Sequence, residues 1–414
     1  MDEISDIFRD WEQGEEEASS LIRRINQQAL SIVQIASEAG FSGNLCQSWL
    51  CWLLLTSENP FSQASERKVC EIKTLWDMAL QDIEVFRALY QFDFAPIEQS
   101  LNIQTFSLLT GGESQKSAFD NRSGISVNHL QQLMRSDADS ETIVKWLSTY
   151  YSNRGTGIFS MECAFRVKEL RNGIQWIPIR SLEGVTLDDL VGCELQKAEL
   201  RRNVEAFVDG RPFNNMLLYG DAGTGKSTSV KGLLNEYHER GLRMVEIHKY
   251  QFKLLADIIA QVRYRSNKFV IFIDDLSFEE NEVEYKYLKA VIEGGLETRP
   301  RNVLICATSN RRHLIRETWN DRSDMEHNGE VHRSDTLEER LSLAARFGCT
   351  VNFNAPDRKQ YHDIVRAIAQ REGVSMEDEE LLRQANQWEL RHGGKSGRAA
   401  KQFVSYLAGE KPQK

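Results

Sequence analysis

The segment Gly220-Asp221-Ala222-Gly223-Thr224-Gly225-Lys226-Ser227 decides the fold of this 414-residue chain. It matches the pattern G-x-x-x-x-G-K-[ST], in which a glycine-rich loop binds phosphate. The apolar run Asn215–Tyr219 before the loop has the length of a strand, and Thr228–Tyr237 after it has the pattern of a helix. Because the motif works between a strand and a helix, its surroundings support a phosphate site.

The residue types in this loop suit a bound anion. Gly220, Gly223 and Gly225 allow backbone angles that are closed to other residues and let the backbone approach phosphate. The helix predicted from Lys226 offers unpaired N–H groups and the positive end of its dipole. Lys226 is predicted to contact the β- and γ-phosphates, and the Ser227 hydroxyl to bind Mg²⁺. The predicted nucleotide-binding residues of the loop are Gly220, Asp221, Ala222, Gly223, Thr224, Gly225, Lys226, Ser227 and Thr228.

The amino-acid composition limits the classes of protein to which the chain can belong. A net charge of -10 does not favour a nucleic-acid binder overall, although a local basic groove is compatible with it. The seven cysteines include no C-x-x-C pair, which favours reduced thiols over a disulfide frame or a zinc site. The acidic start Met1–Asp10 is not a signal peptide, and the apolar core Leu50–Leu55 is too short to span a bilayer. We therefore expect a soluble, cytoplasmic protein with no membrane partner.

Residues 1–155 are predicted to form a mostly helical N-terminal domain that recognises a partner or substrate. In the first helix, apolar residues recur every three or four positions, which predicts one apolar face: Ile22, Ile25, Ala29, Ile32 and Ala36. Packing within the chain is the favoured interpretation, and a coiled coil with a partner is the alternative. The predicted helices are Glu16–Ala39, Leu45–Ser57, Ala64–Gln91, Val127–Met134 and Glu141–Tyr151, with a loop at Thr110–Ser123. No cluster here has catalytic or ligand spacing.

A β-hairpin is predicted within residues 156–181. Gly157–Val167 and Ile174–Ile179 are rich in β-forming residues. Asn172-Gly173 lies between them, and this pair favours a two-residue type I′ turn. The hairpin would pack on the following domain or link the two halves of the chain.

Residues 182–354 alternate between strands and helices, which predicts an α/β core with a parallel sheet covered on both faces. The predicted strands are Met216–Tyr219, Met244–Ile247, Phe269–Ile273, Val303–Thr308 and Thr350–Phe353, and the predicted helices are Gln196–Val208, Phe252–Tyr264 and Glu284–Leu296. Ligands bind such sheets at the carboxyl ends of the strands. Residues 355–414 are predicted to form a small helical lid of three helices, Arg358–Gln370, Glu377–Arg391 and Ser396–Leu407.

Two strands end in side chains suited to phosphoryl chemistry. The run Phe269–Ile273 ends in Asp274, predicted to hold Mg²⁺, and Asp275, predicted to orient or deprotonate the attacking water. The next strand is followed by Asn310, predicted to position that water. Solvated turn residues are the alternative in both places.

These motifs match Walker A, Walker B and sensor 1 in order, so residues 182–408 resemble the AAA+ ATPases. The resemblance implies a P-loop AAA+ fold that uses ATP and Mg²⁺ in a ring or head-to-tail oligomer. In Arg340–Gly348 it implies an arginine finger at Arg346, acting in trans, with a surface salt bridge as the alternative. In Gly393–Arg398 it gives Arg398 the sensor 2 role. In Asp188–Gly192 it places Val191 and Gly192 beside the adenine.

The chain resembles one uncharacterised bacterial AAA+ family more closely. That resemblance rests on Asp274–Phe278, Ala307–Leu314 and Arg346–Gly348. Most Walker B motifs end in Asp-Glu, whereas this one ends in Asp274-Asp275. The shorter side chain predicts an altered water position and slow hydrolysis, or a contribution from Glu279 or Glu280.

Other residues give weaker indications. Ile315–Glu338 contains His327 and His332, but a polar insertion is favoured over a metal site. Tyr250 and Phe252 follow a strand, and helix packing is favoured over substrate threading. The expected function is an ATP-driven conformational change or assembly acting on an unidentified protein or DNA client. The alternatives are a DNA-associated loader or initiator, a remodelling chaperone, and a nucleotide switch with little turnover.

Overall fold

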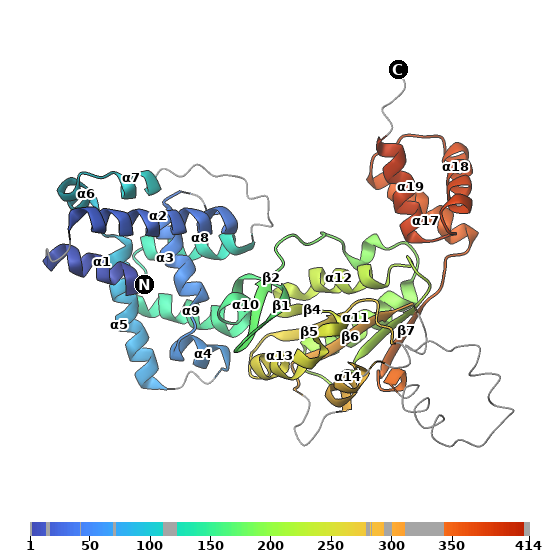
Figure 1. The fold of residues 1–414 in the computed structure, drawn as a ribbon, viewed down its shortest axis with the longest axis horizontal. Helices are drawn as coiled ribbons and strands as arrows, with labels where there is room; N and C mark the ends of the chain where they lie inside the picture. The colour runs from blue at the N-terminus through green and yellow to red at the C-terminus, as the bar shows by residue number, and fades with distance from the viewer. Residues whose placement is uncertain are drawn as a thin grey trace. The chain divides into compact units, whose positions relative to one another are not determined.

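The structure is a computed structural model that describes residues 2–13, 17–41, 43–68, 72–110, 122–278, 282, 284–293, 300–310 and 343–409. The chain divides into two compact units. One unit is Met1–Glu162 with Ile179–Ser181, and the other is Cys163–Pro178 with Leu182–Lys414. Figure 1 shows that the first unit is built from helices and that the second contains the sheet.

The first unit confirms the prediction of a mostly helical N-terminal region. Its central helix α3 packs against α2, α5 and α8, and Cys51 and Leu55 on α3 are fully buried. Ile25, Ile32 and Ala36 of the predicted apolar face of α2 are buried within the unit, which agrees with the packing interpretation. Ile22 is only partly buried, and its neighbour Leu21 is buried instead. The helices are α1 (Asp2–Gln13), α2 (Ala18–Ala39), α3 (Leu45–Thr56), α4 (Pro60–Glu66), α5 (Lys73–Tyr90), α6 (Ala95–Leu101), α7 (Thr105–Thr110), α8 (Arg122–Arg135), α9 (Ser140–Arg154) and α10 (Ile158–Met161).

Two sequence predictions in this region are wrong in detail. The single helix predicted over Ala64–Gln91 is two helices, α4 and α5. Asn59 caps α4, Pro60 opens it, and Lys68 after its end takes a φ of +58°, which an α-helix cannot continue through. The strand predicted from Gly157 begins only at Ala164, because Gly157 (φ +64°) opens the short helix α10 instead.

The second unit contains a seven-stranded sheet in the order β2-β1-β4-β5-β6-β3-β7. All neighbouring strands are parallel except β1 and β2, which confirms the predicted sheet type. The interior strand β6 is buried along its whole length, as expected of a strand covered on both faces. The strands are β1 (Ala164–Leu170), β2 (Gly173–Pro178), β3 (Met216–Gly220), β4 (Leu242–Ile247), β5 (Lys268–Ile273), β6 (Val303–Ser309) and β7 (Cys349–Phe353).

The predicted hairpin forms, and it extends the core sheet. Strand β1 pairs in parallel with β4, with Ala164 opposite Met244. Leu170 pairs with Gly173, so the two turn residues are Arg171 and Asn172, one position earlier than predicted. Neither takes a positive φ, so the turn is not type I′, whereas Gly173 takes a φ of +128°.

Helices flank this sheet on both sides. Figure 1 shows α12 on one face of the sheet and α13 and α14 on the other. The helix predicted over Phe252–Tyr264 is a 3₁₀ segment followed by a shorter α-helix. The helical segments are η1 (Leu187–Asp189), α11 (Glu194–Val208), α12 (Lys226–Tyr237), η2 (His238–Arg240), η3 (Lys249–Leu254), α13 (Leu255–Val262) and α14 (Glu284–Glu293).

The three predicted lid helices are confirmed as α17 (Arg358–Arg371), α18 (Asp378–Arg391) and α19 (Gly397–Gly409). They enclose a small apolar core of their own, which includes Tyr361, Val365 and Phe403. A capping box between Asp357 and Gln360 begins α17. Across the described part of the chain, none of the helices combines the length and the apolar character that a membrane crossing needs.

Candidate functional site

The phosphate-loop pattern lies where β3 ends and α12 begins. Gly220 has a φ of +131°, and a Cβ there would lie 2.1 Å from the Phe353 carbonyl oxygen of β7. The Asp221 N–H donates to the same oxygen at 3.0 Å. Gly225 (φ +100°) precedes α12, so the loop turns into the helix at Lys226. The helix therefore presents its first N–H groups at the loop.

Lys226 is buried, and its ammonium group lies within the loop. Nζ donates to the Gly220 carbonyl at 2.8 Å, the Asp221 carbonyl at 2.6 Å and Asn310 Oδ1 at 2.9 Å. Burial lowers the pKa of Lys226, while the nearby carboxylates, led by Asp221, act in the opposite direction. These bonds place a cation where the loop meets the end of β6.

A hydroxyl–carboxylate cluster lies next to this cation. Ser227 Oγ donates to Asp274 Oδ1 at 2.6 Å, and Thr308 Oγ1 donates to the same oxygen at 2.6 Å. A hydroxyl and a carboxylate are hard oxygen donors of the kind that Mg²⁺ prefers. Thr308 has no role in the sequence prediction, because only the pairing of β5 with β6 brings its hydroxyl to the two aspartates.

Asp275 and Asn310 also face each other. Asn310 Nδ2 donates to Asp275 Oδ1 at 2.8 Å, and the Asp275 N–H donates to Thr308 Oγ1 at 2.9 Å. Asp275 has a φ of +52°, a region that costs energy for a residue other than glycine. Since β5 and β6 are neighbours, their carboxyl ends bring together side chains that lie far apart in the sequence.

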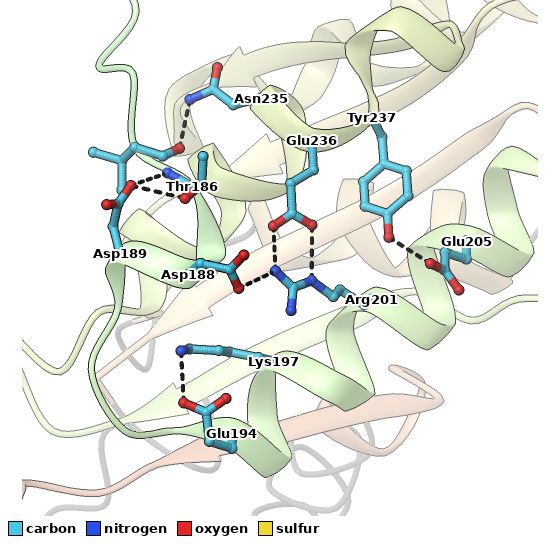
Figure 2. A network of polar contacts seen from close by, with 11 residues as sticks. Thr186, Asp188, Asp189, Glu194, Lys197, Arg201, Glu205, Asn235, Glu236 and Tyr237 are labelled. Carbon is cyan, nitrogen blue, oxygen red and sulfur yellow. Dashed lines mark hydrogen bonds and ion pairs between the residues drawn. The ribbon is translucent and has the colours of Figure 1, made fainter.

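The segment Thr186–Leu190, which precedes α11, packs against the phosphate loop. A Cβ on Gly225 would lie 2.9 Å from Leu190 Cδ2, so this segment packs against the phosphate loop. Figure 2 shows Arg201 bonded to both Asp188 and Glu236, and Asp189 bonded to Thr186. The hydrogen bond from Arg201 lowers the pKa of Asp188.

The two residues predicted to lie beside the adenine follow directly. Val191 and Gly192 are partly buried, and Gly192 has a φ of +77°. Their place next to the Leu190 contact is compatible with the predicted role.

The lid contacts the loop through its backbone. The Arg398 N–H donates to the Gly223 carbonyl at 3.2 Å, and the Ala355 N–H donates to Asp221 Oδ2 at 2.7 Å. The side chain of Arg398 is exposed. The structure thus brings the predicted sensor 2 residue to the phosphate loop.

Arg346 is not joined to this group of residues. Its guanidinium forms an ion pair with Glu293 at the end of α14 in the same chain. An action on a neighbouring subunit therefore stays a prediction.

Several candidate residues fall outside the described part of the chain. These are Glu279, Glu280 and the insertion with His327 and His332. Phe252 is buried, which agrees with helix packing, whereas Tyr250 is exposed and stacks on His248. Among the residues that the structure describes, no group of three or more His, Cys, Asp and Glu side chains could hold a metal ion.

The arrangement fits a nucleoside triphosphate with Mg²⁺. A buried ammonium and a helix N-terminus suit the phosphates, and the oxygen atoms of Ser227 and Asp274 suit the cation. Asp275 is separate from the Ser227–Asp274 contact and is held by Asn310. The site therefore holds a buried ammonium, a hydroxyl–carboxylate pair and a further carboxylate at separate positions.

Comparison with known proteins gives a family and a partial structural likeness. The family model described as "Protein of unknown function (DUF815)" matches residues 160–411. A solved structure of the Thermotoga maritima RuvB Holliday junction branch migration motor matches at 18% identity with a TM-score of 0.38. A substituted variant of that motor matches at 19% identity with a TM-score of 0.36. Each match covers 53% of this chain and 63% of the motor chain, so less than two thirds of the motor is represented.

Proposed function

This chain belongs to the DUF815 family, and on that premise we propose that it is an AAA+ ATPase that binds ATP with Mg²⁺ and hydrolyses it. The observation that carries the proposal is a single connected network at the strand ends. It runs from Lys226 through Asn310 to Asp275, and Thr308 connects Asp275 with Asp274. Phosphoryl transfer needs little more from a protein than this positioning and charge.

Each residue of this network has a separate proposed role in the in-line hydrolysis of ATP. Lys226 and the first N–H groups of α12 bind the phosphates, and Ser227 and Asp274 hold the cation. Bound Mg²⁺ would offset the negative charge of the phosphate oxygens. Asp275 accepts the proton as a water oxygen bonds to the γ-phosphorus and the bond to the β–γ bridging oxygen breaks. Asn310 orients Asp275 and the water.

The test separates binding from turnover. Lys226→Ala should abolish binding of a fluorescent ATP analogue, whereas Asp275→Asn should bind it and fail to release phosphate. Lys231→Ala is the matched control, because Lys231 lies on the same helix in an exposed ion pair with Glu183. Nucleotide binding by Lys226→Ala at the normal affinity would refute the proposal. Normal turnover by Asp275→Asn would remove Asp275 from the role of base.

A nucleotide switch with little turnover is the second candidate. The observation that favours it is Asp275 itself, one methylene shorter than the usual glutamate and already bonded to Asn310. An ångström of displacement is enough to slow catalysis strongly. Asp275→Glu should then raise phosphate release under single-turnover conditions. If the wild-type chain already turns over faster than Asp275→Glu, the switch candidate is wrong.

The proposal also assigns a role in acting on a client molecule to each region of the chain. We assign ATP binding to residues 182–354, the lid to 355–414 and client recognition to 1–155, with the hairpin region 156–181 between them. Subunits would assemble head to tail, in a ring or an open chain, with Arg346 of each reaching the neighbour's ATP. A protein client is favoured over DNA by the net charge of -10.

The proposed compartment is the cytoplasm. In the described part of the chain, Cys46, Cys51, Cys163, Cys193, Cys306 and Cys349 are free thiols. Free thiols are typical of a reducing compartment.

A further inference from the structure

The segment Thr186–Leu190 carries two neighbouring aspartates, and a different arginine binds each. Arg201 of α11 donates to Asp188 Oδ1 at 2.7 Å and makes two bonds to Glu236 of α12, at 3.0 and 2.6 Å. Figure 2 shows Arg201 between these two carboxylates. The second arginine, Arg371, is the last residue of the lid helix α17. It donates to Asp189 Oδ1 at 3.0 Å and to the Asp189 carbonyl at 3.1 Å.

The core holds this segment in place without help from the lid. The Thr186 N–H and hydroxyl donate to Asp189 Oδ2 at 2.7 and 3.0 Å. Asn235 Nδ2, from α12, donates to the carbonyl oxygens of Glu183 at 2.8 Å and Val185 at 2.7 Å. Arg371 therefore contacts a segment whose shape is already set.

The same segment lies directly beside the phosphate loop, because Leu190 packs at Gly225. The lid's contacts at Gly223 and Asp221 use backbone N–H groups of the lid, which no side-chain substitution removes. The contact of Arg371 with Asp189 is made by a lid side chain. It can be removed while the phosphate loop stays intact.

We propose that Arg371 is a positioning residue that latches the lid onto the segment beside the phosphate loop and so slows the release of bound nucleotide. The proposal rests on the proposed function, since it concerns the same nucleotide. The fork of a guanidinium reaches a carboxylate and a carbonyl at once, which a lysine cannot do with the same geometry. The pair is partly exposed, at 45% for Arg371 and 32% for Asp189, so salt weakens it.

The test compares Arg371→Gln with a matched control within the lid. Arg366 is 44% exposed and pairs with Asp378 and Asp363, both on lid helices. In a chase experiment, Arg371→Gln should release a fluorescent ATP analogue about three- to fivefold faster than wild type, the range of an exposed ion pair. Arg366→Gln should release it at the wild-type rate, and Arg371→Lys at an intermediate rate. Added salt should speed release from wild type more than from Arg371→Gln.

A second readout needs no nucleotide. Hydrogen exchange of the Ala355 and Arg398 amides, which bond to the phosphate loop, should be faster in Arg371→Gln than in wild type and unchanged in Arg366→Gln. The latch is refuted if Arg371→Gln matches wild type in both experiments, or if Arg366→Gln changes equally. If wild type binds no nucleotide, the proposed function fails, while the exchange comparison still decides whether Arg371 holds the lid.

Discussion

Asp275 combines a strained backbone with a polar role. Its φ of +52° costs an L-residue about 1 kcal/mol or more, whereas glycine adopts this conformation freely. Asp275→Gly should therefore raise the midpoint of thermal unfolding of the sheet-containing unit by about 2–4 °C. It should also abolish phosphate release.

Lys68→Gly is the control for this prediction. Lys68 has a φ of +58° in the first unit, far from the network at the strand ends in sequence. Lys68→Gly should stabilise the helical unit without changing the rate of ATP turnover. Calorimetry with a phosphate-release assay checks both variants, and a lower midpoint for Asp275→Gly would show that its side chain contributes more than the strain costs.

Thr308 supports both aspartates through one hydroxyl. Thr308→Val keeps the shape but leaves the partly buried Asp275 N–H without its acceptor, at a cost of about 1 kcal/mol. It also removes the bond to Asp274, which should weaken Mg²⁺ affinity about tenfold. Urea denaturation and an Mg²⁺ titration of ATP binding measure the two effects.

Thr350→Val tests whether the effect belongs to the site. Thr350 is an exposed residue of β7, so the same change there should stay within about 0.5 kcal/mol. If both variants lose the same stability, the effect of Thr308→Val comes from the strand propensity of valine and not from the site.

The sequence was informative about residues where chemistry and position agree. Lys226, Ser227 and Asp274 follow apolar strand runs, so parallel pairing brings them to one edge of the sheet. The sequence does not predict a role for Thr308, because a threonine ends many strands and only the side-by-side position of β5 and β6 reveals its two partners. No pattern in the sequence pairs Arg371 with Asp189, since 182 positions separate them.

At the scale of elements, the phosphate loop depends on the approach of β7 to Gly220. A Cβ there would meet the Phe353 carbonyl oxygen at 2.1 Å, and φ is +131°. Gly220→Ala should destabilise the sheet unit by about 3 kcal/mol, because backbone on both sides must shift. Gly184→Ala is the control, since a Cβ on Gly184 meets nothing within 4 Å. A urea midpoint for Gly220→Ala equal to that of Gly184→Ala would contradict the prediction.

The predicted elements succeeded or failed for identifiable reasons. The strands of the core were found within about two residues, because buried parallel strands are short continuous apolar runs. The helix predicted over Ala64–Gln91 failed since its apolar spacing continues across Lys68, where the backbone leaves the helix. The hairpin was found, but its register differs by one residue, which the Asn172-Gly173 pair alone could not fix.

At the scale of the molecule, Arg346 predicts cooperation between subunits. Removing an arginine finger lowers turnover about 10³-fold, so Arg346→Ala should bind ATP and hydrolyse it very slowly. Mixing it with Lys226→Ala should restore part of the activity, because in the proposed head-to-tail assembly one variant supplies Arg346 to the intact ATP site of the other. A phosphate-release assay over mixing ratios measures this.

Glu293→Gln separates this role from a structural one. It breaks the ion pair of Arg346 within the chain but leaves the arginine free to reach a neighbour. Turnover should persist in Glu293→Gln. If Glu293→Gln loses as much turnover as Arg346→Ala, and mixing does not restore it, then Arg346 acts only through its ion pair with Glu293.

The hairpin β1–β2 has a consequence for how this protein can be recombined. Residues 163–178 belong to the sheet unit, whereas residues 179–181 return to the helical unit. The family match likewise begins at residue 160, just ahead of β1. A chimera joined at residue 182 would strip two strands from one side of the sheet and expose the edge of β4. A transplant of the sheet unit onto a different helical unit must therefore start upstream of Ala164 and carry the short return segment with it.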